Sequence, residues 1–253
     1  MRKVELISES ASVSMGEAWF DIVNSDHFWI QWRLNALKKI LRFFPKKGMA
    51  LEVGCGNGLV MEQIEQLGYI TDGCDLNRVA LETISEDVKG KVMLYNIYDR
   101  SKDLLGKYSM VFLMDVIEHI EDDVDFLKTS AEYLQSDGIV IVNVPAYNSL
   151  FSKYDKEVGH VRRYTKRQLA ETLNKAGIEP LVVSYWGAFL FPIAVVRKMT
   201  IGFTPSSGII KRGMTPPGKL AHLFLKALMK MESILPFAVP FGTSVIAIGK
   251  MKK

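Results

Sequence analysis

The chain has 253 residues, of which 48% are hydrophobic and 24% are charged, and its formal net charge is +4. This length can bury a sizeable core, and the composition is that of a globular protein, although the mean hydropathy of +0.10 is slightly high for a cytoplasmic one. The modest charge argues against nucleic acid as the partner. No run reaches the roughly eighteen apolar residues of a membrane span.

The start of the chain and its two cysteines indicate a reducing compartment. Met1 to Glu5 lack the apolar core of a signal peptide, so we expect a cytoplasmic protein, with attachment to a membrane surface left open. Cys55 and Cys74 do not show the spacing of metal ligands, and we expect two free thiols.

The N-terminal region is expected to be helical after a polar start. Residues 1–12 carry no clear pattern and are predicted to lack regular structure, whereas residues 13–44 show helical spacing of apolar side chains. His27, Phe28 and Trp29 make this segment richer in aromatic residues than simple packing requires. One interpretation is a helix that packs on a sheet, because aromatic stripes usually indicate burial.

A glycine-rich turn is the most informative stretch of the sequence. The buried strand expected at 50–53 runs into Gly54-Cys55-Gly56-Asn57-Gly58, where alternate glycines allow a sharp bend and let a ligand lie against bare backbone. A second strand, 69–74, ends at Asp75, where a carboxylate can accept hydrogen bonds from both hydroxyls of a ribose. These features predict a nucleoside pocket.

Glu52 indicates which nucleoside the pocket takes. This acid lies two residues before the first glycine, where it would repel the pyrophosphate of a dinucleotide and attract a cation. The glycines also follow G-x-G-x-G spacing instead of the G-x-G-x-x-G of dinucleotide sites. A nucleoside with a positive charge and no phosphate is therefore favoured over a nicotinamide cofactor.

The Glu52 to Gly58 segment resembles the first motif, E/D-x-G-x-G-x-G, of class I S-adenosylmethionine-dependent methyltransferases. The resemblance implies a Rossmann-like, doubly wound α/β fold with seven mostly parallel strands, of which the last is antiparallel. It also implies S-adenosylmethionine as cofactor, S-adenosylhomocysteine as product, and no metal. For the N-terminal helix, related enzymes with a helical cap imply a second interpretation beside packing on a sheet, a lid over the cofactor cleft. The first cofactor-binding residues that it assigns are Glu52, Gly54, Cys55, Gly56, Asn57, Gly58, Asp75 and Leu76.

Two further strand ends carry candidate cofactor contacts. After a third strand at 91–95, the resemblance places Asn96 and Ile97 beside the adenine. A fourth strand at 108–114 is followed by Asp115-Val116-Ile117-Glu118-His119-Ile120, which resembles the D-x-x-E-H-I/V segment of small-molecule methyltransferases. Asp115 and Val116 would face the methionine half of the cofactor. His119 is a general base or a structural donor.

The acceptor side is expected after the fifth strand, 139–144. The loop at 145–165 mixes aromatic and charged residues and resembles the D-x-x-x-G-H-x-R-R-Y-T segment of methyltransferases linked to modified sugars, lipids or quinones. His160 is the second candidate base. Thr165 is expected to cap a helix at 166–176. The candidate acceptor contacts are Trp29, Arg33, Tyr147, Arg162, Arg163 and Tyr164.

The C-terminal part is basic and apolar. A sixth strand at 178–184 precedes a stretch that has no acid between Pro180 and Met231 but seven lysines and arginines. A helix at 220–235 and a last strand at 243–249 follow. The stretch suits either a membrane surface or a helical pair at the sheet edge. We divide the chain into an N-terminal helical cap (1–45), a cofactor-binding core (46–187), and a helical insertion with the last strand (188–253).

These predictions combine into one functional hypothesis. The chain is expected to be an S-adenosylmethionine-dependent methyltransferase that acts on a small molecule, with amphiphilic, lipid-linked, sugar and quinone-like acceptors all open. The alternatives are a non-catalytic, membrane-associated protein with the same fold and a nicotinamide-dependent oxidoreductase. The atom that is methylated and the oligomeric state are not determined by these patterns.

Overall fold

The computed structural model describes residues 3–11, 25–44, 48–201, 209, 218–235 and 239–252. Several predicted features lie outside these residues: the first half of the N-terminal helix with Trp19, Phe20 and Val23, its expected end at 45–47, Lys211 and Arg212, and the loops at 204–208 and 215–217.

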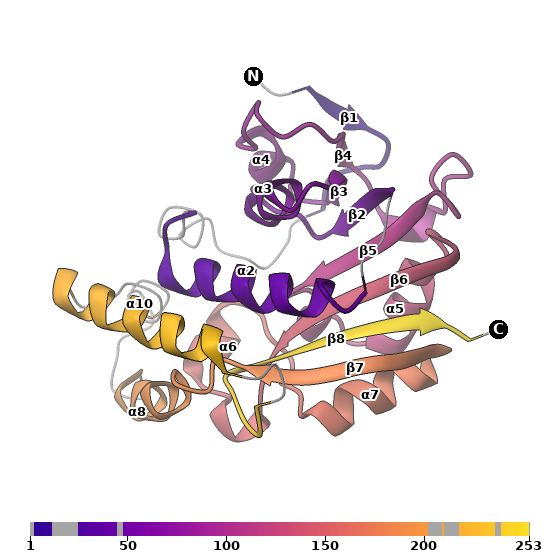
Figure 1. Cartoon of the computed structure of the whole chain (residues 1–253). Coiled ribbons are helices and arrows are strands. Elements are labelled where there is room, and N and C mark those ends of the chain that lie inside the picture. Colours follow the sequence, from indigo (N-terminus) through magenta and orange to yellow (C-terminus); the bar gives the residue numbers. More distant parts are fainter. Residues whose placement is uncertain are drawn as a thin grey trace.

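The core of the fold is an eight-stranded sheet with the order β1-β4-β3-β2-β5-β6-β8-β7 (Figure 1). The first six strands in this order are parallel, and β8 runs antiparallel to both β6 and β7. The predicted mostly parallel α/β fold with an antiparallel last strand is therefore confirmed. The strands are β1 (Val4–Leu6), β2 (Met49–Val53), β3 (Ile70–Asp75), β4 (Val92–Leu94), β5 (Tyr108–Met114), β6 (Leu134–Pro145), β7 (Ile178–Trp186) and β8 (Ser244–Met251).

The expectation of seven strands and an unstructured start was wrong. Val4, Glu5 and Leu6 pair in parallel with β4, and the backbone N–H groups of Ile7 and Ser8 both donate to the Leu94 carbonyl. A three-residue edge strand needs a partner on one side only, so it carries little of the apolar periodicity from which strands are predicted.

Helices cover both faces of the sheet (Figure 1). Helices α2 (Phe28–Leu41), α3 (Leu59–Gln66) and α10 (Lys219–Ile234) pack on one face, and α5 (Asp123–Ala131) and α7 (Lys166–Lys175) pack on the other. Burial on both faces explains why all seven residues of β5 are buried and why the central strands read as apolar runs. The remaining helices are short or peripheral: α4 (Arg78–Glu82), α6 (Lys153–Glu157), α8 (Phe191–Ile201), η1 (Ile97–Asp99), η2 (Ile117–His119) and η3 (Asn148–Leu150).

Local signals set the boundaries of several helices. Thr165 caps α7 as predicted, because its hydroxyl accepts a hydrogen bond from the Gln168 N–H while the Gln168 side chain accepts one from the Thr165 N–H. Asp122 caps α5 in a similar way. Strand β6 begins earlier than expected, at Leu134, and its pairing with β5 shifts register between Tyr108 and Met110. No helix in the described part of the chain combines the length and apolar character needed to cross a bilayer.

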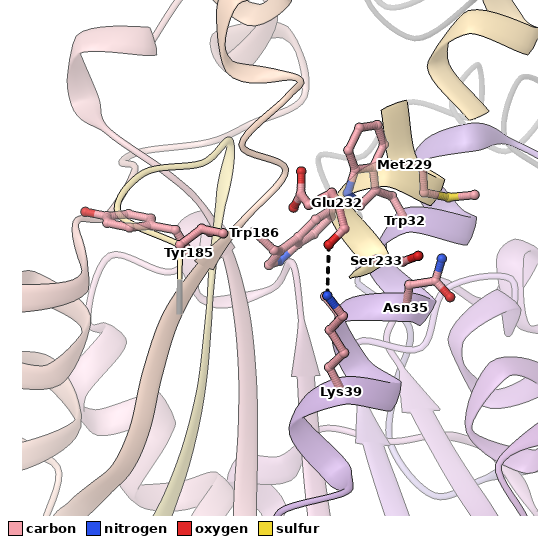
Figure 2. A pocket seen from close by; sticks show the side chains of 10 residues that line it. Trp32, Asn35, Lys39, Tyr185, Trp186, Met229, Glu232 and Ser233 are labelled. Atoms are coloured by element: carbon pink, nitrogen blue, oxygen red, sulfur yellow. Dashed lines mark hydrogen bonds between the residues drawn. The ribbon is translucent and has the colours of Figure 1, made fainter. Parts of the chain in front are cut away.

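Helix α10 is fastened to the core by one buried carboxylate. Glu232 accepts hydrogen bonds from the backbone N–H groups of Gly187 and Phe189 at 2.6 and 3.2 Å, just after β7. Its own carbonyl accepts from Nζ of Lys39 on α2 at 2.9 Å, across a small pocket that Trp32 and Trp186 also line (Figure 2). Glu232 therefore holds the end of β7, α10 and α2 together.

We expect Glu232→Ala to lower the free energy of unfolding by about 2 kcal/mol, because one buried and one partly buried N–H group lose their acceptor. Glu179→Ala, at an exposed position of β7, is the control and should change stability by less than about 0.5 kcal/mol. Urea unfolding of both variants measures the two changes in the free energy of unfolding. Equal effects would show that Glu232 does not anchor α10.

Candidate functional site

The glycine turn between β2 and α3 requires glycine for both conformation and space. Gly54, Gly56 and Gly58 have φ angles of 76°, 52° and 78°, in the left-handed region that other residues rarely adopt. A Cβ on Gly54 would lie 2.7 Å from Cγ2 of Val116, and one on Gly58 would lie 2.9 Å from Cγ2 of Ile84. The turn therefore presents bare backbone at the carboxyl end of β2.

Asp75 ends the neighbouring strand and is bonded to this turn. Its Oδ2 accepts from the Gly56 N–H and its Oδ1 from the Asn77 N–H, both at 2.8 Å. Burial raises its pKa, while these backbone bonds oppose the rise. The backbone N–H groups do not occupy every lone pair of the two oxygens, so the carboxylate can accept further donors from a ligand that lies on the turn. Asn57 and Leu76 complete this rim, and both are partly exposed.

Glu52 lies beneath the turn as a buried acid that lacks a full set of partners. It is 1% exposed, and among the described residues its Oε2 has no hydrogen-bond partner. Burial raises its pKa well above the usual value, and the nearby charges of Asp75 and Asp115 add to the rise, whereas Arg33 opposes it. Such a site favours a cation, because a positive charge would compensate a carboxylate that the fold has desolvated.

Arg33 links the N-terminal helix to the segment after β5. Its Nη1 donates to Oδ2 of Asp115 at 2.7 Å, and the guanidinium lies 4.7 Å from the ring centroid of Trp29. Asn143 donates to Oδ1 of Asp115 at 2.8 Å and accepts from Nε1 of Trp186 at 2.7 Å. Arg33 was predicted on the acceptor side, but it is 3% exposed and bonded to a predicted cofactor residue.

His160 and Asp155 form the centre of the loop after β6. Nδ1 of His160 lies 2.9 Å from Oδ1 of Asp155, which also accepts from Nε of Arg163 at 2.7 Å. Burial alone would raise the pKa of Asp155, but the His160 hydrogen bond and the Arg163 charge hold it well below its usual range. Asp155 is therefore a carboxylate that orients both side chains.

His119 lies against His160 but differs from it in environment. The two rings meet edge to face, with centroids 4.8 Å apart. Burial, together with the nearby His160, lowers the pKa of His119 to about 4. At neutral pH the His119 imidazole is therefore uncharged. The structure brings both predicted histidines together beside Glu118, which precedes His119 in η2.

The other predicted contacts are less accessible or are engaged elsewhere. Tyr164 is 2% exposed and donates to Asp123, which places it in the core and argues against contact with an acceptor. Arg162 also binds Asp123, at 2.9 Å. Tyr147 stacks on Tyr185 with centroids 5.0 Å apart. Asn96 caps η1, and the Ile97 side chain is buried.

Three residues of this region were not among the predicted site residues. Glu118 and Asp155 stand inside the two motif segments, and Asn143 is a polar residue within an otherwise apolar strand. An isolated amide in such a run indicates a specific buried partner. The free thiols Cys55 and Cys74 are buried, as expected for unpaired cysteines.

Comparison with known proteins gives a family and a fold. Residues 26–183 match the family model described as "Methyltransferase domain". The ubiquinone biosynthesis O-methyltransferase of Caulobacter vibrioides is 29% identical over 104 residues, which cover 39% of this chain and 41% of that protein. The protein of the same name from Haemophilus ducreyi is 25% identical over 56% of this chain and 65% of its own length. The chain matches less than half of the length of this Caulobacter protein and of two other proteins with the same name.

Solved structures share the fold at low sequence identity. A possible histamine N-methyltransferase from Thermotoga maritima aligns over 93% of this chain and 94% of its own, with a TM-score of 0.55 and 15% identity. The plantazolicin methyltransferase BpumL in complex with S-adenosylhomocysteine covers 89% and 85%, with a TM-score of 0.56 and 15% identity. A methyltransferase from Archaeoglobus fulgidus covers 87% and 93%, with a TM-score of 0.54 and 14% identity.

We expect Arg33→Met to lower the free energy of unfolding by about 3 kcal/mol, because it leaves the Asp115 carboxylate without its cation. Arg78→Met removes an exposed pair with Glu82 and should cost no more than about 0.5 kcal/mol. Denaturant unfolding of both variants makes the comparison. If the two substitutions cost the same, α2 is not held by this ion pair.

Proposed function

The chain belongs to the methyltransferase-domain family, and on this premise we propose that it transfers a methyl group from S-adenosylmethionine to a hydroxyl group of a small molecule. The observation that carries the proposal is the glycine turn with Glu52 beneath it and Asp75 at its rim. The names of the curated relatives support an oxygen atom as the acceptor.

The residues of the turn fit the cofactor in charge and shape. Glu52 keeps a carboxylate oxygen without a partner among the described residues, which suits the ammonium or sulfonium of the ligand. Asp75 has acceptor capacity for ribose hydroxyls, and a Cβ on Gly54 would collide with Val116. Bound S-adenosylmethionine supplies a methyl group that its positively charged sulfur makes electrophilic.

The acceptor is proposed to approach between the Asp115 segment and the loop at 145–165. The N–H of Val161 donates to the carbonyl of Glu118 at 2.8 Å, so the two segments meet directly. Asp155 fixes the ring of His160, whose Nε2 lies toward Glu118. The chain's contribution is to align the acceptor oxygen with the methyl group, to exclude water and to receive or direct the hydroxyl proton.

We expect Gly56→Val to abolish binding of S-adenosylhomocysteine. Valine is strained at a φ of 52°, and its branched side chain would stand on the backbone surface where the ligand lies. For the unchanged chain, ligand at about 100 times Kd should add about 2.7 kcal/mol to the free energy of unfolding, and NAD should add nothing. Calorimetry and melting temperatures measure both effects.

Gly106→Val is the matched control for backbone strain. Gly106 has a φ of 64° and is exposed, and a Cβ added to it would meet no atom within 4 Å. The control should lose stability but retain binding of S-adenosylhomocysteine. Unchanged affinity in Gly56→Val, or a melting shift with NAD alone, would contradict the proposed cofactor and favour the nicotinamide alternative.

A membrane surface is the proposed setting for the acceptor. Along α10 the exposed apolar residues recur at helical spacing and form one stripe: Leu220, Leu223, Phe224, Met231 and Ile234. Lys219 and Lys230 are exposed on the same helix, and Val196 and Met199 add apolar surface on α8. An exposed apolar stripe with basic neighbours suits binding in the plane of an anionic lipid surface, where an amphiphilic acceptor would reside.

We expect the double variant Leu223→Glu with Phe224→Glu to weaken flotation with phosphatidylglycerol-containing vesicles at least about tenfold, because two apolar side chains no longer enter the lipid. The matched control, Leu6→Glu with Val79→Glu, changes side chains of similar exposure on β1 and α4 and should float normally. If neither the unchanged chain nor the control floats with the vesicles, the membrane setting is excluded. Flotation without methyl transfer to any tested acceptor would favour the non-catalytic alternative.

A further inference from the structure

Three side chains that can bind a metal ion converge beside the proposed acceptor entrance. Glu118 and His119 belong to η2, and His160 comes from the loop before α7. One potential ligand atom from each lies within 4.8 Å of the other two. The cluster unites segments that are about forty residues apart, because the Val161 N–H binds the Glu118 carbonyl.

Glu118 is the least satisfied group of the cluster. Its side chain is completely buried, and neither carboxylate oxygen has a hydrogen-bond partner among the residues that the structure describes. Among the described residues, the nearest basic atom is Nε2 of His160, which is 3.9 Å from Oε1 and too far for a hydrogen bond. A buried carboxyl group without partners is costly, so the position of Glu118 indicates a partner that the described residues do not supply.

His160 is held as a ligand would be held. Asp155 is a carboxylate and can only accept, so the proton on His160 lies on Nδ1, which is 2.9 Å from Oδ1 of Asp155. The lone pair on Nε2 is then free on the side that faces Glu118. A carboxylate behind a histidine that binds metal through its other nitrogen is a frequent second layer of metal sites, because it fixes the tautomer and raises the basicity of the ligand.

His119 completes the set. Its ring lies edge to face against that of His160, and one ring nitrogen is hydrogen-bonded to the Gly159 backbone carbonyl. The second ring nitrogen is therefore available as a ligand atom within the cluster.

We infer that Glu118, His119 and His160 bind one divalent transition-metal cation. Two imidazoles with one carboxylate suit zinc and the neighbouring first-row metals, and three protein ligands leave at least one position open. Metal bonds of about 2.1 Å require ligand atoms about 3.4 Å apart, so ligand atoms that now lie within 4.8 Å of one another must approach by up to about 1.4 Å on binding. The role of the ion rests on the proposed function: an acceptor hydroxyl at the open position would lose its proton to solvent more readily.

The probe is Co²⁺, whose visible absorption reports coordination by nitrogen and oxygen. The full chain, first freed of metal with a chelator, should bind one equivalent of Co²⁺ that Zn²⁺ displaces. Glu118→Gln and His160→Ala should each weaken binding at least about tenfold, and Asp155→Asn, which removes the second-layer acceptor, should weaken it by about 10-fold to 100-fold. His222→Ala, on α10 and outside the cluster, is the matched control and should bind as the unchanged chain does.

Two readouts separate this inference from the proposed function. Calorimetry with S-adenosylhomocysteine should give equal affinity for His160→Ala and the unchanged chain, which also shows that the variant folds. Loss of Co²⁺ binding with retained ligand binding supports the metal site. Absence of a Co²⁺ spectrum in the unchanged chain, or an equal spectrum in His160→Ala and Glu118→Gln, overturns it, whether or not the cofactor binds.

Discussion

Buried negative charge at the carboxyl edge of the sheet is the constraint on which the rest of this structure depends. Glu52, Asp75, Asp115 and Glu118 all lie where parallel strands end, and burial raises the pKa of each. Such groups are tolerated only where hydrogen bonds or cations compensate them. The compensation is uneven across the edge, and this unevenness defines where ligands can bind.

Asp75 and Asp115 are compensated within the protein, whereas Glu52 and Glu118 are not. Asp75 is bonded to the backbone of the glycine turn, and Asp115 is paired with Arg33 and Asn143. Glu52 and Glu118 keep buried oxygens without partners among the described residues. Glu52 lies under the glycine turn at the end of β2, and Glu118 lies beside His160 in the segment after β5. Two separate positive charges, an organic cation and a metal ion, are the partners that we propose for them.

The N-terminal helix and the loop after β6 gain their positions from the same electrostatic requirement. Arg33 brings α2 onto the Asp115 segment, and Trp186 extends the contact to the end of β7 through Asn143. Arg163 and His160 fold the loop around Asp155. The interpretation of α2 as a helix that packs on the sheet and its interpretation as a lid are therefore compatible, because its buried face includes a residue that completes the proposed cofactor site.

The sequence by itself determined the fold class, the glycine turn and the carboxylate of Asp75 at the end of β3. These features are local: positive φ angles demand glycine, strands covered on both faces are apolar, and parallel strands end at the same edge. Only the tertiary structure decided that Arg33 meets Asp115, 82 residues away, and that Glu118 faces His160. It also placed Tyr164 in the core and added β1 at the sheet edge. Contacts between distant segments depend on how helices and loops pack against one another. The spacing of residues within a single segment does not predict that packing.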